Sequence, residues 1–248
     1  MNDKGSMAGR RTAEETHQRS IITHSVLTGL TPLIPVPVLD DLAKNYFRRR
    51  MVRALAASHG RDISAAEVEA LTAERGGGCL SGCLVQAVVY PLKKIFRKIF
   101  FFLEWKRAVD LTSQTYHHGY LFDYAMQKGA GGPAVLDLRG VGDVRAAIEA
   151  ACRESSIKPV EGAVRASFRQ SRNVLRAAAG LLGQSLRRVR GSANREEVAR
   201  AIEEVEPAEE REIEGVVTRL QKSITAVPDD HFRHLRGRFR AHLGLPAE

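Results

Sequence analysis

Residues 21–39, "IITHSVLTGLTPLIPVPVL", decide how the rest of this chain is interpreted. The stretch holds nineteen residues without a formal charge when His24 is neutral, close to the roughly 20 apolar residues of a membrane span. Three prolines lie in its second half: Pro32, Pro35 and Pro37. A proline inside a helix costs about 3 kcal/mol, and lipid has no water to satisfy the freed carbonyl groups. The stretch therefore favours a shallow helical hairpin or a buried turn, and its outer face is covered either by protein or by lipid.

The residues that follow predict two helices. Residues 40–59 carry apolar side chains at helical spacing, with Asp40 as the N-cap and Gly60 as the stop. In "DISAAEVEALTAER" (62–75), Ser64 and Glu67 have the spacing of a capping box. We therefore expect a short second helix that begins after Ser64.

The block "GLTPLIPVPVLDDLAKNYFRRRMVRALAASHGRDIS", within residues 28–64, resembles a bacterial family of uncharacterised helical domains attached to or encoded beside small GTPases. The matching positions are Pro35, Pro37, Asp40, Met51, Val52, Leu55, Ala56, Gly60 and Ile63. The resemblance implies membrane association and a GTPase-type partner. The arginines at 48–50 depart from the family pattern, and no GxxxxGK[ST] motif marks the chain itself as a P-loop GTPase.

A second apolar segment, residues 83–107, is strongly cationic. A helical projection gives it a bulky apolar side and a basic side, which is typical of a helix lying in a lipid headgroup layer. The predicted lipid-facing or interface residues are Lys93, Lys94, Arg97, Lys98, Phe100, Phe101, Phe102 and Trp105. The alternative is a core helix of a bundle with solvated lysines. Four of these cations, Lys93, Lys94, Arg97 and Lys98, lie in the middle of the segment and argue against a simple transmembrane helix.

Composition narrows the classes of partner. The 248 residues have 38 Lys and Arg against 29 Asp and Glu, a net charge of +9, and a pI of about 9.8. This balance favours anionic partners, either a membrane surface or nucleic acid. Three cysteines without disulfide-framework spacing, and no apolar signal region at the start, predict a cytoplasmic location.

An arginine-rich helix is predicted over residues 163–190, with an apolar seam at steps of three and four. Beside the seam lies a possible anion-binding stripe: Arg165, Arg169, Arg172 and Arg176. The stripe would follow a phosphate backbone or pair with the many glutamates of residues 196–214 in a helical hairpin. Pro207 is expected to start a new helix at its first turn.

The nearest approach to a catalytic cluster is "TYHHGYLFDY" (115–124), which contains His117, His118 and Asp123. Adjacent histidines on a helix point about 100° apart, so they do not share one metal ion readily. A structural role at a polar edge is therefore favoured over a metal-dependent enzyme, and no cofactor or metal is predicted. No serine elbow, paired-carboxylate turn or phosphate loop is found in the sequence.

The sequence therefore predicts an all-α protein, since no alternating strand pattern is found. We expect a flexible arm (1–12), a lipophilic helical module (13–128), a Gly-rich linker (129–143) and a C-terminal antiparallel helical bundle (144–248). The expected function is a non-catalytic scaffold or adaptor, peripheral or monotopic on the cytoplasmic face of the inner membrane. The alternative function is nucleic-acid binding.

Overall fold

The computed structural model describes residues 3–34, 39–73, 97–128, 132–189 and 195–246. These residues form ten α-helices and one short 3-10 helix, with no strand among them beyond a single bridge between Lys128 and Ala134, so the all-α prediction is confirmed. In chain order the elements are α1 (Asp3–Leu30), η1 (Thr31–Leu33), α2 (Leu39–Ser58), α3 (Ala65–Thr72), α5 (Arg97–Met126), α6 (Val135–Leu138), α7 (Val141–Glu154), α8 (Lys158–Gln170), α9 (Arg172–Arg188), α10 (Arg195–Ile224) and α11 (Asp229–His242).

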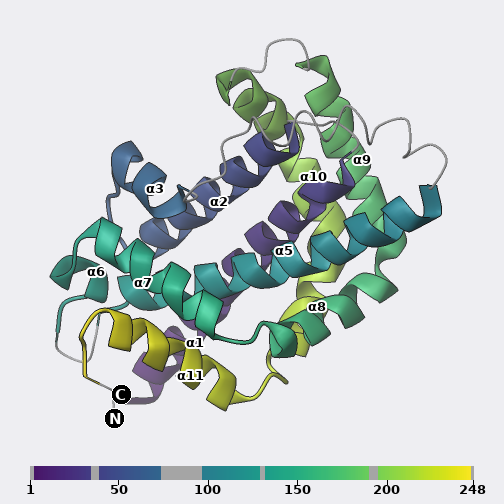
Figure 1. Cartoon of the computed structure of the whole chain (residues 1–248). Coiled ribbons are helices and arrows are strands. Elements are labelled where there is room, and N and C mark those ends of the chain that lie inside the picture. The colour runs from purple at the N-terminus through teal and green to yellow at the C-terminus, as the bar shows by residue number, and fades with distance from the viewer. Residues whose placement is uncertain (1–2, 35–38, 74–96, 129–131, 190–194, 247–248) are drawn as a thin grey trace.

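Helices α1 and α5 cross the middle of the bundle, with α3, α6 and α7 at the left and α8, α9 and α10 at the right (Figure 1). The two central helices approach closely because glycines lie where they cross. A Cβ on Gly29 would lie 1.8 Å from Thr112 Oγ1 and 2.9 Å from the carbonyl oxygen of Ala108. A Cβ on Gly119 would lie 2.8 Å from Ile21 Cγ2. These pairs run in opposite directions along the chain, so α1 and α5 are antiparallel.

The described part of the opening stretch, residues 21–34, lies in the protein core. Its apolar side chains Ile21, Ile22, Val26, Leu27 and Leu30 are all buried, and α2, α5 and α10 pack against α1. Pro32 lies at the start of η1, where a missing N–H costs nothing. Of the two alternatives that the sequence left open for this part of the chain, a cover of protein or of lipid, the structure shows the cover of protein. In the described residues no helix is long and apolar enough to cross a membrane.

The structure confirms some of the predicted helix ends and places others at different residues. Ser64 Oγ accepts from the Glu67 backbone N–H, and the Glu67 carboxylate accepts from the Ser64 backbone N–H, which is the expected capping box. Gly60 adopts φ 63° just after α2, as expected of a stop. Asp40 is in the first turn and is not the N-cap, because α2 begins at the buried Leu39.

Helix α1 begins at Asp3, so it includes most of the residues that were predicted as a flexible arm (1–12). Residues 3–12 contain no proline that would end this helix. The described part of the predicted 129–143 linker contains α6 and the start of α7. There Asp137 accepts from Arg61 Nη1 at 3.0 Å, which ties this segment to the end of α2.

Helices from both predicted halves share one core. The buried cluster runs from Ile21 in α1 to Leu243 after α11, and α10 packs against α1, α2, α8 and α9. Arg50 on α2 forms an ion pair with Glu206 on α10 at 2.5 Å. Helix α10 continues through Pro207, contrary to the predicted new start, because it packs against its neighbours along a length of 30 residues.

Candidate functional site

The N-terminal end of α5 carries exposed apolar side chains. Phe102 is 68% exposed and Leu103 is 52% exposed, and the only other large apolar side chain found exposed among the described residues is Leu138. The next two cations along the helix, Lys106 and Arg107, are also exposed. Of the predicted interface residues, Lys93 and Lys94 lie outside the described residues. Arg97, Lys98, Phe100 and Phe101 belong to α5, but their side chains lie outside the described part.

Trp105 does not join this exposed end, contrary to the sequence prediction. Its side chain is 8% exposed and packs edge-on against Phe168 of α8, with the ring centroids 5.8 Å apart. The guanidinium of Arg172 lies 5.5 Å from the centroid of the indole ring. Trp105 is covered because α8 packs on this turn of α5, which an amphipathic pattern in one helix does not reveal.

The predicted arginine stripe is interrupted. The expected helix over 163–190 is divided into α8 and α9 at Ser171, whose φ of −118° and ψ of 18° are not helical. Arg165 forms an ion pair with Glu161 one turn earlier in α8, and Arg172 covers Trp105. The expected seam is buried at Val164, Phe168, Leu175, Leu182 and Leu186, and α9 packs against α10 as the predicted hairpin requires. Arg165 and Arg169 lie on α8, whereas Arg172 and Arg176 lie on α9, so the four residues do not form a stripe along a single helix.

His117 and His118 do not meet Asp123. His117 Nδ1 donates to the carbonyl oxygen of Ser113 at 2.8 Å, and its Nε2 lies 2.8 Å from Nε2 of His231 on α11. Burial lowers the pKa of His117 to about 4. Burial, together with the nearby charge of Arg48, lowers the pKa of His118 to about 3. Both rings are therefore neutral packing residues near pH 7.

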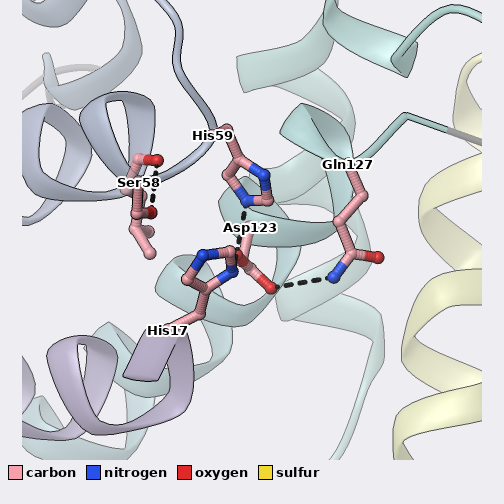
Figure 2. A network of polar contacts seen from close by, with 6 residues as sticks. His17, Ser58, His59, Asp123 and Gln127 are labelled. Atoms are coloured by element: carbon pink, nitrogen blue, oxygen red, sulfur yellow. Dashed lines mark hydrogen bonds and ion pairs between the residues drawn. The ribbon is translucent and has the colours of Figure 1, made fainter. Parts of the chain in front are cut away.

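Asp123 instead meets two histidines that are far away in the sequence. His17 Nδ1 and His59 Nε2 lie 3.0 and 2.7 Å from the same oxygen, Asp123 Oδ1. The other carboxylate oxygen accepts from Gln127 Nε2 at 3.2 Å. Figure 2 shows the two imidazole rings converging on the carboxylate from α1 and from the end of α2. We call His17, His59 and Asp123 the His–Asp–His cluster.

The local fold positions each member of this cluster. His59 follows the last residue of α2, where the chain turns through Gly60 and the Arg61 N–H donates to the carbonyl oxygen of Ala56 at 2.8 Å. The antiparallel packing of α1 and α5 places His17 beside Asp123. Gly60, a position matched in the family resemblance, thus forms the turn that directly follows His59 of the cluster. Pro35 and Pro37 lie outside the described residues, and the side chain of Asp40 lies outside the described part.

A cleft of about 700 Å³ opens beside the cluster between α1, α5 and α11. Asp123 and Gln127 line it together with Glu14, Glu15 and Gln18 from the first part of α1. Its far side is built from three tyrosines of α5, one per helical turn, and the arginines of α11. The Tyr120 hydroxyl accepts from Arg236, and the Tyr124 hydroxyl accepts from Arg240 Nη1 at 2.8 Å. The cluster therefore lies at the edge of a polar, solvent-connected cleft.

Comparisons of this chain with protein-family models, curated proteins and solved structures found no match. The resemblance of residues 28–64 to a GTPase-associated family stays a prediction.

Proposed function

We propose that this protein is a non-catalytic helical scaffold or adaptor that attaches to anionic membrane surfaces through the N-terminal end of α5. The proposal rests on one observation: Phe102 and Leu103 are exposed side by side on α5, directly after a cationic, aromatic segment. An apolar pair that is not covered by the described part of the chain is a common feature of interaction surfaces.

The apolar part of this surface supplies binding energy by burial. Moving a Phe or Leu side chain from water into an apolar layer is worth about 1.5–3 kcal/mol. Two such side chains alone give weak, reversible attachment. The N-terminal end of α5 lies at the right edge of the bundle in Figure 1.

The basic residues of the same segment supply the charge complementarity that favours lipid as the occupant. Lys93, Lys94, Arg97 and Lys98 precede the exposed pair in the sequence. Each cation near an anionic membrane surface contributes about 1 kcal/mol. Apolar and cationic residues together are the two signals that stable peripheral attachment needs.

The proposal places the protein on the cytoplasmic face of the inner membrane as a peripheral or monotopic protein. There it would present the rest of the bundle to a protein partner. A GTPase-type partner is proposed from the resemblance of residues 28–64 alone.

The test is cosedimentation of the purified chain with vesicles of phosphatidylcholine, with and without about one third phosphatidylglycerol. We expect binding only to the anionic vesicles, weakened by salt because exposed charges are screened. Reversing the four cations, K93E/K94E/R97E/K98E, is expected to weaken binding by at least about 100-fold. The variant F102S/L103S is expected to weaken it by at least about 100-fold.

A matched control reverses four exposed cations elsewhere and so has the same net charge: R169E/R187E/R200E/K222E. It should retain most of the vesicle binding, and L138S serves in the same way for the apolar pair. The proposal is overturned if the chain ignores anionic vesicles, or if both charge variants lose binding equally. Tighter binding to RNA or DNA than to vesicles would favour the nucleic-acid alternative.

A further inference from the structure

We infer that the His–Asp–His cluster is a binding site for one divalent transition-metal ion, with Zn²⁺ as the natural occupant. The ligands would be His17 Nδ1, His59 Nε2 and an oxygen of Asp123. This inference is independent of the membrane proposal, since the cluster and the exposed end of α5 share no residue.

The geometry fits one ion with small adjustments. One ligand atom from each of the three residues can be chosen so that all three lie within 4.8 Å of one another. Zn²⁺ binds histidine nitrogen and carboxylate oxygen at about 2.0–2.2 Å, which for tetrahedral angles separates the ligand atoms by roughly 3.3–3.6 Å. His17 Nδ1 and His59 Nε2 lie 3.0 and 2.7 Å from Asp123 Oδ1, so a small outward movement of the rings would make room for the ion. The two imidazole rings meet at 63° and do not stack in parallel, so both nitrogens can face a shared point.

The donor set selects the class of ion. Two imidazoles and one carboxylate are the protein ligands of zinc sites that keep a fourth position for water, and of open iron(II) sites. Mg²⁺ and Ca²⁺ prefer oxygen donors alone, so they fit less well. When the ion binds, each neutral ring carries its proton on the other nitrogen, Nε2 of His17 and Nδ1 of His59.

The surroundings support the cluster as a metal site in two further ways. Gln127 donates to the second oxygen of Asp123 at 3.2 Å, and such outer hydrogen bonds orient metal-binding carboxylates. The three side chains are 11–12% exposed, so solvent reaches them while most of their surface is shielded from bulk water. Asp123 and Gln127 line the cleft of about 700 Å³, which gives water or a second ligand access to an open coordination position.

The ligands come from three different helical segments, α1, the end of α2 and α5. An ion bound there would join these segments and stabilise the folded chain, because the unfolded chain does not hold the three residues together. Metal binding is thus expected to be visible as a gain in stability as well as by direct titration.

The experiment uses the full chain without an affinity tag in a C79S/C83S/C152S background, which removes every thiol ligand. After treatment with a chelator, Zn²⁺ is titrated by calorimetry, and Co²⁺ is followed by its visible absorbance and by X-ray absorption. We expect one ion per chain with a Kd of about 10 µM or tighter. X-ray absorption of the cobalt form should report two imidazole ligands with oxygen ligands completing the shell.

The variants D123N, H59Q and H17Q are expected to weaken Zn²⁺ binding by at least about 100-fold. Q127A is expected to weaken it by about 10-fold through the lost outer hydrogen bond. The matched control H117Q alters the other close histidine pair, that of His117 and His231, and should leave Zn²⁺ binding unchanged. Zn²⁺ should raise the melting temperature of the parent chain but not that of D123N.

The inference is overturned if the parent chain binds no stoichiometric Zn²⁺, or if D123N, H59Q and H17Q all retain it. The X-ray absorption spectrum needs no variant, so it decides the question even if a substitution prevents folding. A spectrum with one or no imidazole ligand would show that the three residues form only a hydrogen-bonded cluster.

Discussion

The apolar half of α1 and the N-terminal end of α5 differ in what covers them. Residues 21–34 are packed on by α2, α5 and α10, whereas Phe102 and Leu103 face solvent. Gly29 lets α1 lie directly against the backbone of α5 at Ala108. At the α5 end the exposed pair Phe102 and Leu103 are adjacent residues, which point about 100° apart around a helix. Small residues at a crossing point, more than hydropathy, distinguish the covered segment from the exposed one.

The largest expected effect comes from closing the contact that covers α1. In Gly29→Val the new side chain would meet Thr112 and the Ala108 carbonyl oxygen, and we expect a loss of about 4 kcal/mol in the free energy of unfolding. Urea denaturation measures it. The control Gly180→Val adds the same side chain to α9 where a Cβ meets nothing within 4 Å, and it should change stability by less than about 0.5 kcal/mol. Equal losses in both variants would contradict the close crossing.

The same truncation in the two regions compares them directly. Leu27→Ala removes a fully buried side chain of α1 and should cost about 3 kcal/mol. Leu103→Ala removes a side chain that is 52% exposed and should cost less than about 0.5 kcal/mol. Thermal and urea unfolding of the two variants measure the difference. If both substitutions were costly, the end of α5 would be covered by protein after all.

Helix α10, which packs on α1, contains one unfavourable buried group, the carboxyl group of Glu209. Glu209 is fully buried, and neither of its carboxyl oxygens has a hydrogen-bond partner among the described residues. Burial, with the charges of Glu206 and Glu210, raises the pKa of Glu209 to about 8 from the usual 4.5. The unfolded chain then loses this proton first, so stability falls as pH rises from about 4.5 to about 8. Glu209→Gln should remove this fall and be about 2 kcal/mol more stable at pH 8.

Urea denaturation at pH 5, 7 and 9 measures this effect. The exposed Glu212→Gln is the control and should show the same pH dependence as the parent chain. A Glu209→Gln variant with the parent's pH profile would mean that Glu209 is ionised in the folded protein.

The smallest expected effect reports on the polar residue inside the apolar stretch. Burial lowers the pKa of His24 to about 4, although its Nδ1 donates to the carbonyl oxygen of Ser20 at 2.8 Å. As pH falls, His24 of the unfolded chain binds a proton near pH 6.5, whereas His24 of the folded chain binds one only near pH 4. The free energy of unfolding is therefore highest above about pH 6.5 and decreases as pH falls toward 4. At pH 5.5, His24→Gln should reduce this acid destabilisation by about 1 kcal/mol. Titration of His24 by NMR would give a pKa near 6.5 instead if α1 were uncovered.

Local patterns predicted the helices well because their determinants are close in sequence. The capping box at Ser64 and Glu67 and the stop at Gly60 involve neighbours only, and so does the apolar seam of residues 164–186. The break at Ser171 was missed because the seam continues across it. Trp105 was placed wrongly because its cover comes from Phe168 and Arg172 on other helices.

The candidate metal site was only one third visible in the sequence. Asp123 was singled out, but beside His117 and His118, which belong to the same helix. Its actual neighbour His59 is 64 positions away, and His17 lies near the start of the chain. No spacing rule connects them, because three separate helical segments must pack before the ligand atoms meet.

The packing of α10 against α1 has a consequence for synthesis on the ribosome. Helix α1 is made first, but one of the helices that cover it ends only at Ile224. The apolar side chains of α1 therefore remain without part of their final contacts during most of translation. Exposed hydrophobic surface of this kind favours aggregation. We expect incomplete chains that end before residue 224 to bind chaperones, and the full-length chain not to bind them.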